Sequence, residues 1–99
     1  MKVYIVQLDW DADDSADVEL YVYDSYDKAR KKFKELIANE LNPELSWVGE
    51  LDWENGKPVG NYSLWSKDSS DKEQVLYWHI LDNWNGKYSY INLYIMGVM

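Results

Sequence analysis

The feature that most constrains the fold is one helical pattern set between two regions of alternating apolar residues. Between Asp24 and Pro43 the apolar residues recur every three or four positions, as one face of an amphipathic helix requires. Asp24-Ser25 can accept hydrogen bonds from the first free backbone N–H groups, and Asn42-Pro43 ends the pattern because proline disfavours an α conformation in the residue before it. We therefore expect one helix, with an apolar stripe formed by Tyr26, Ala29, Phe33, Leu36 or Ile37, and Leu41.

Two strands are predicted before this helix. Residues 2–9 are β-branched or aromatic on both faces, which is typical of a central strand. In residues 18–23, Val18, Leu20 and Val22 alternate with one acidic and two aromatic residues, the pattern of a half-buried strand. We expect the two strands to pair as an antiparallel hairpin across an acidic loop from Trp10 to Asp17.

After the helix the apolar pattern returns to period two. A strand over residues 47–53 is expected to turn at Asn55-Gly56, because both central residues of a type I′ turn need positive φ, and to return from about Lys57 to Trp65. Residues 74–81 and 87–98 are expected to form a second hairpin across residues 82–86. The order ββαββββ predicts a single α+β domain over residues 1–99: a twisted antiparallel sheet of five to six strands with one helix packed on a face.

The charge of the chain is divided unevenly. The formal net charge is −8, and five of the ten basic residues fall in residues 28–34, so the rest of the chain carries −13. Such a surface repels nucleic acid and membranes and suits a basic protein partner. We expect the basic side chains of the helix to neutralise nearby carboxylates rather than to bind nucleic acid.

Six Trp, nine Tyr and one Phe are more aromatic residues than a core of this size needs. Trp and Tyr are enriched at interface hot spots because they bury a large area at little entropic cost. Since Trp84 lies in a predicted turn and Trp10 in a predicted loop, we expect both rings to be exposed.

Motifs for catalysis, cofactors or metals are not recognisable in the sequence. Asp9, Asp11 and Asp13 match the first ligand positions of an EF-hand loop, but Asp14 stands where glycine is needed and Leu20 where a bidentate Glu is needed. We expect a solvated acidic loop, with calcium binding as a minor alternative. The one histidine, His79, lies within a predicted strand and is expected to be structural, so we predict a protein that is not an enzyme and has no cofactor.

Cysteine is absent, and the chain has neither a recognisable signal peptide nor a run of about 20 apolar residues. We expect a soluble, cytoplasmic protein.

The first half of the chain resembles small uncharacterised proteins encoded by bacteria and their phages. The resemblance covers roughly residues 2–41 and rests on the opening strand Lys2–Val6, the strand Val18–Tyr23 and the helix entry Tyr23-Asp-Ser-Tyr-Asp-Lys-Ala-Arg. Compact acidic proteins from this setting include anti-CRISPR proteins and other DNA-mimicking inhibitors. The resemblance implies no particular site residues.

These observations lead to one functional hypothesis. We expect a small acidic inhibitor or adaptor, anti-CRISPR-like in its sharpest form, that binds a basic protein such as a nuclease or another nucleic-acid-binding protein. Carboxylates would occupy Lys/Arg sites that otherwise hold phosphates, and tryptophans would supply the desolvated anchors. The expected partner-binding residues are Asp9, Trp10, Asp11, Asp13, Asp14, Asp17, Trp53 and Trp84.

Other classes stay open. An immunity or antitoxin protein would share the acidity and the protein target, and a small ligand- or carbohydrate-binding module would use the tryptophans as stacking platforms. A homodimer is also open, because an apolar C-terminal strand at a sheet edge could pair across a two-fold axis.

Overall fold

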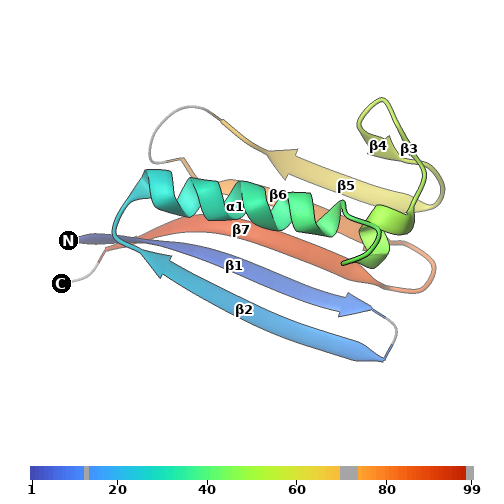
Figure 1. Ribbon diagram of the computed structural model, residues 1–99, viewed down its shortest axis with the longest axis horizontal. Coiled ribbons are helices and arrows are strands. Elements are labelled where there is room, and N and C mark those ends of the chain that lie inside the picture. Colours follow the sequence, from blue (N-terminus) through green and yellow to red (C-terminus); the bar gives the residue numbers. More distant parts are fainter. Residues whose placement is uncertain (13, 70–73, 98–99) are drawn as a thin grey trace.

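A five-stranded antiparallel sheet carries one helix on one of its faces (Figure 1). The computed structural model describes residues 1–12, 14–69 and 74–97. The sheet has the order β2-β1-β7-β6-β5, and a two-stranded sheet, β3-β4, follows a short 3₁₀ helix, η1. The predicted α+β class is confirmed. The elements are β1 Lys2–Ala12, β2 Ser15–Tyr23, α1 Tyr26–Glu40, η1 Trp47–Glu50, β3 Trp53–Glu54, β4 Lys57–Pro58, β5 Tyr62–Lys67, β6 Leu76–Asp82 and β7 Tyr88–Gly97.

The core lies between α1 and the three central strands. Alternate residues of β1, β7 and β6 point toward the helix, as the period-two geometry of a strand requires. Phe33 of α1 is fully buried against them, with Ala29 and Leu36 on the same stripe of the helix. The fully buried apolar residues of the strands are Val6, Leu76, Ile80, Ile91 and Leu93.

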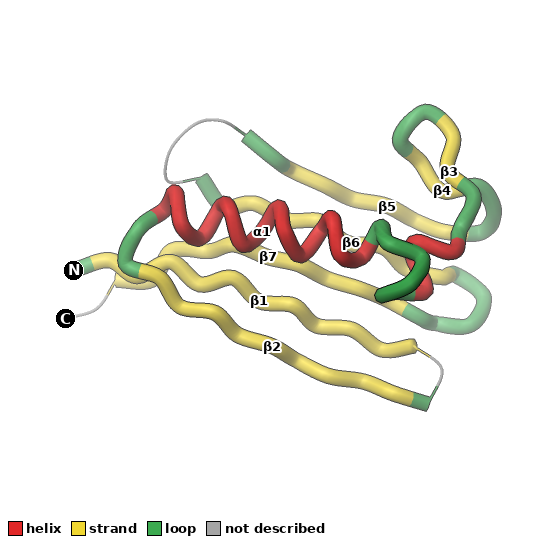
Figure 2. The backbone as a smooth tube through the Cα atoms, viewed as in Figure 1, coloured by secondary structure: helices red, strands yellow, loops and turns green. Residues whose placement is uncertain are grey.

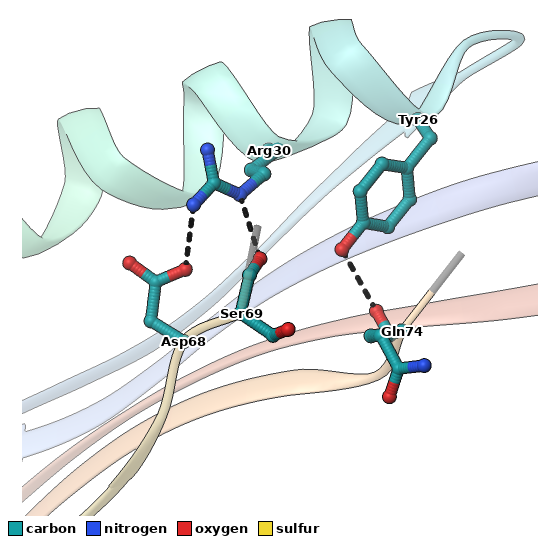
Figure 3. Close-up of polar contacts among 5 residues, drawn as sticks. All are labelled: Tyr26, Arg30, Asp68, Ser69 and Gln74. Atoms are coloured by element: carbon teal, nitrogen blue, oxygen red, sulfur yellow. Dashed lines mark hydrogen bonds and ion pairs between the residues drawn. The ribbon is translucent and has the colours of Figure 1, made fainter. Parts of the chain in front are cut away.

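Polar contacts fasten α1 to the chain on either side of residues 70–73 (Figure 3). The Arg30 guanidinium bonds Asp68 at 3.0 Å and the carbonyl oxygen of Ser69 at 3.2 Å, and the Tyr26 hydroxyl donates to the carbonyl oxygen of Gln74 at 3.1 Å. Further along the helix surface, Lys28 pairs with Asp24 at 3.3 Å and Lys32 with Glu35 at 3.4 Å. Carboxylates near the helix thus neutralise part of its basic charge.

The expected acidic loop over residues 10–17 is wrong, because the hairpin ladder continues through it. Trp10 pairs with Asp17 and Ala12 pairs with Ser15 across β1 and β2. The alternation simply persists: Trp10 and Ala12 continue the inward row of β1, while Asp9 and Asp11 continue the outward row. β1 ends at Ala12 and β2 begins at Ser15, and Asp13 lies outside the described residues.

The strand expected over residues 47–53 is also wrong over most of its length. Residues 47–50 form η1, whose first turn is capped by the Ser46 hydroxyl accepting from the Val48 N–H at 3.3 Å. The Asn55-Gly56 turn is confirmed, with φ of 51° and 76°. The single return strand is instead two, β4 and β5, separated by residues 59–61, where Gly60 has φ of 116°.

The second hairpin is confirmed as β6 and β7, but its C-terminal strand does not lie at the edge of the sheet, where a homodimer through this strand would need it. β7 lies between β1 and β6, so the C-terminal strand is not at an edge and cannot pair across a dimer axis. The edge strands of the sheet are β2 and β5. Residue 98, the expected end of this hairpin, lies outside the described residues.

Candidate functional site

The face of the sheet opposite α1, here called the open face, carries no described helix (Figure 2). Its edge strand presents three aliphatic side chains in a row, Val18, Leu20 and Val22, which are 53%, 60% and 62% exposed. We call them the aliphatic row. Exposed apolar side chains that are contiguous on one surface mark interaction sites more often than scattered ones do.

A line of rings in contact with one another crosses the same face and is here called the ring ladder. The ring centroids of Tyr88 and Tyr90 are 4.7 Å apart, those of Tyr90 and His79 are 4.7 Å apart, and those of His79 and Tyr77 are 5.4 Å apart. Trp65 stands opposite His79 in the β5–β6 pairing and is 49% exposed. Rings held by their neighbours lose little further freedom on binding, so this surface suits an interface.

His79 is a member of this ladder, and its surroundings explain its presence. Its Nε2 lies 2.7 Å from the Asn92 Oδ1 on the neighbouring strand, while Tyr77 and Tyr90 pack on its ring. These contacts orient the imidazole as part of the sheet surface.

Acidic side chains gather at one end of the sheet, around the tip of the β1–β2 hairpin. Asp9 and Asp11 lie on the open face beside Tyr88, and the Tyr88 hydroxyl donates to the Asp9 Oδ1 at 3.4 Å. Burial raises the pKa of Tyr88, and the negative charges of Asp9 and Asp11 raise it further. Asp14, at the tip, and Asp17 are exposed. We call these four residues the acidic end.

The predicted tryptophan anchors separate into two groups. Trp84 is 79% exposed in the β6–β7 turn, as expected, and this turn lies at the same end of the sheet as the hairpin tip (Figure 1). Trp10 is not exposed as expected: it packs against the core on the helix side. Trp53 also packs there, and its Nε1 donates to the Val48 carbonyl oxygen at 3.2 Å. Asp9, Asp11, Asp14, Asp17 and Trp84 thus lie at one end of the sheet. Trp10 lies at this end too but packs on the helix side, and Trp53 also packs against the core.

Sequence reasoning missed the aliphatic row and the ring ladder. One signal was present: β2 is apolar on both sides, with aliphatic residues on one and Tyr21 and Tyr23 on the other. Because an edge strand of a two-layer fold buries one side only, one of the two sides had to be exposed.

On the helix side, a cleft of about 590 Å³ opens between the C-terminal half of α1, the β1–β2 hairpin and the segment before η1. Its aromatic lining comes from Trp10, Tyr21 and Trp47, and its charged lining from Glu19, Lys32 and Glu40. Glu40 is 8% exposed. Clefts of this size accommodate small organic groups.

Within residues 1–12, 14–69 and 74–97, no group of three or more His, Asp or Glu side chains is placed to hold a metal ion. No helix in this part of the chain has the length and apolar character needed to cross a membrane. Comparison with protein-family models, with curated proteins and with solved structures finds no match to this chain.

Proposed function

We propose that this protein is a small acidic inhibitor or adaptor that docks through its open face onto a basic protein, with a nucleic-acid-handling protein as the sharpest form of the partner. The observation that carries the proposal is the open face itself, where the uncovered aliphatic row and the ring ladder lie on either side of β1 and are bordered by the acidic end.

The distribution of charge supports this direction of approach. The five basic residues of α1 lie on the helix side of the sheet, whereas Asp9 and Asp11 project on the open face. A basic partner is therefore attracted to the acidic end and kept away from the helix. Long-range attraction of this kind raises the association rate and orients the encounter.

The apolar residues would then supply the stability of the complex. Leu20 and Val22 are already held in a strand, and the rings of Tyr88 and Tyr90 are already stacked, so their burial costs little further conformational entropy. Asp9 and Asp11 lie two residues apart on β1, about 6.8 Å along the strand, and together with Asp14 and Asp17 they form an array of carboxylates. Such an array can occupy Lys/Arg sites that otherwise hold phosphates, which is how a DNA mimic would act.

The test is affinity capture from a bacterial lysate with the tagged protein, eluted in steps of rising salt. Three forms are compared: the wild type, the Leu20→Ser/Val22→Ser variant of the open face, and Leu41→Ser as the control. Leu41 is 42% exposed at the end of α1, on the other side of the sheet. We expect a basic protein that is retained by the wild type and the control and lost from the open-face variant.

Capture that is unchanged by the open-face variant would contradict the proposal. Adding duplex DNA to the isolated complex then tests whether the partner is a nucleic-acid-handling protein that is bound at its nucleic-acid site. Displacement of the partner by DNA supports occupation of a nucleic-acid site, whereas a complex indifferent to DNA and to salt would contradict mimicry.

A further inference from the structure

The cleft on the helix side is lined by the carboxylate of Glu40, and in the part of the chain that the structure describes, hydroxyl donors bind only one of its two oxygens. Glu40 is the last residue of α1, and its Oε2 accepts hydrogen bonds from the Ser46 hydroxyl and, at 3.2 Å, from the Ser89 hydroxyl. Among the described residues, none donates to Glu40 Oε1 and no Lys, Arg or His lies within ion-pairing distance of this carboxylate. A buried carboxylate without a counter-ion is costly unless something else compensates it.

The position of Glu40 in the helix makes this cost larger. The C-terminal end of a helix carries partial negative charge from its free carbonyl groups, so cations are favoured there and anions are not. The last turn of α1 contains no basic residue. The Glu40 carboxylate therefore adds its negative charge to the negative potential at the end of the helix.

One cation does line the cleft, but it is already engaged. The Lys32 ammonium lies 4.4 Å from the centroid of the Tyr21 ring and 3.4 Å from the Glu35 carboxylate. A second carboxylate of the lining, Glu19, accepts from the Tyr21 hydroxyl at 3.1 Å. The charges that line the cleft therefore sum to a net negative value.

The walls of the cleft suit the apolar part of a cation. Trp10, Tyr21 and Trp47 contribute aromatic surface, and Leu8 and Leu36 contribute aliphatic surface. Aromatic faces attract ammonium and guanidinium groups, and Lys32 over Tyr21 is one such contact within this lining. An alkyl stem can pack on these walls while its charged head approaches a carboxylate.

We propose that this cleft binds an organic cation, an alkylammonium or alkylguanidinium group, with Glu40 Oε1 as its acceptor. The cation is either a free amine or a Lys or Arg side chain of another protein. The cleft lies on the helix side and the docking surface on the open face, so this proposal does not rest on the proposed function.

The first experiment compares two probes of nearly the same shape, N-butylguanidinium and the neutral N-butylurea, by calorimetric titration. Indole N–H resonances of Trp10 and Trp47 report where each probe binds. Because both probes can donate N–H groups to the carboxylate but only the guanidinium carries a positive charge, we expect the urea to bind about ten- to a hundredfold more weakly. Equal binding of the two probes, or no saturable binding of the cation, would overturn the proposal.

The second experiment changes the acceptor. Glu40→Gln keeps the size of the side chain and an oxygen for the two serine hydroxyls, and removes the charge. We expect it to lose at least about tenfold in affinity for N-butylguanidinium. The control Glu44→Gln removes the same charge from an exposed residue outside the cleft lining and should bind as the wild type does. An unchanged affinity in Glu40→Gln would exclude this carboxylate as the acceptor.

The comparison of the two probes on the wild type needs no variant, so it decides the question even if Glu40→Gln does not fold. Titration with a lysine-containing tripeptide amide and with butylammonium then separates the two sources. Tighter binding of the peptide points to a protein side chain, and tighter binding of butylammonium points to a free amine. Failure of every cation to bind would leave the open-face proposal unaffected.

Discussion

Asp82 shows how one side chain organises the end of the sheet. It is 5% exposed at the end of β6, where its Oδ1 accepts from the backbone N–H groups of Trp84 at 2.9 Å and Asn85 at 3.2 Å. Its Oδ2 accepts from the Asn85 side-chain amide at 3.1 Å. Burial by itself raises the pKa of Asp82, but these hydrogen bonds, assisted by the Lys87 charge, outweigh it and lower the pKa below its ordinary value of 3.8. The carboxylate thereby fixes the turn that presents Trp84.

The stability that is lost when this carboxylate is replaced should depend on pH. Asp82→Ala leaves backbone donors of the turn unpaired, so we expect the free energy of unfolding at neutral pH to fall by about 1–3 kcal/mol. Because the folded-state pKa is lowered, this contribution is complete above the unfolded-state pKa and disappears as pH falls through the folded-state value. Urea unfolding of both proteins at about pH 7 and about pH 2 measures the difference. A deficit equal at both pH values would show that the charge of Asp82 is not what stabilises the turn.

At the scale of the element, β2 explains both a success and a failure of sequence-based prediction. Alternation identified the strand, but it could not tell which side faces the helix, because both sides are apolar. The register decides: Tyr21 pairs with Val6 and Tyr23 with Tyr4, so the rings turn inward and the aliphatic row turns outward. From an edge strand a long ring still reaches the core: the Lys32 ammonium lies over the Tyr21 ring, and the Glu19 carboxylate accepts from the Tyr21 hydroxyl. Val6 and Tyr4, the cross-strand partners that set this register, are distant in sequence, so no local pattern in β2 identifies them.

The failure at residues 47–50 has a similar cause. Trp47, Gly49 and Leu51 alternate as a strand would, yet the structure has a 3₁₀ helix because Gly49 packs against the backbone that follows α1. The cleft behind this contact could not be predicted from the sequence either. Its residues Glu40 and Ser89, which share a hydrogen bond, are separated by 49 positions along the chain. The acidic end was more accessible, since its four aspartates lie close together in the sequence at the tip of a predicted hairpin, although the strand pairing around them was not predicted.

Gly49 offers a test of this close packing. A Cβ at Gly49 would overlap with backbone atoms of Asn42 and Pro43, which cannot rotate away as a side chain can. We expect Gly49→Ala to lower the free energy of unfolding by about 1–3 kcal/mol, the usual cost of overpacking. Gly97→Ala is the control, because a Cβ there meets no atom within 4 Å and the φ of Gly97 is not positive. Urea unfolding compares the two, and equal stability of both variants would contradict the proposed packing constraint.

At the scale of the whole molecule, charge and exposed apolar surface oppose each other. A net charge of −8 keeps copies of the chain apart, while the aliphatic row and the exposed Trp65 favour contact between them. As pH falls toward the isoelectric point of about 4.4, carboxylates take up protons and the repulsion vanishes.

Self-association should therefore rise on approach to this pH. We expect light scattering at fixed concentration to increase near about pH 4.4 and to be reduced in the Leu20→Ser/Val22→Ser variant, because that variant removes apolar surface from the open face. Leu41→Ser should scatter as the wild type does. Scattering that increases equally in all three proteins would mean that association does not use the open face.

The two strands at the centre of the sheet are nearly the most distant along the chain. β1 pairs with β7 from Lys2 opposite Gly97 to Asp11 opposite Tyr88, whereas β1–β2 and β6–β7 are local hairpins (Figure 1). The seam that joins the two hairpins thus has to close a loop of almost the whole chain before its own contacts can form. The pairing of β1 with β7 should therefore be the slow step of folding. If the β1–β2 hairpin forms earlier, the edge of β1 that later pairs with β7 stays uncovered until this step.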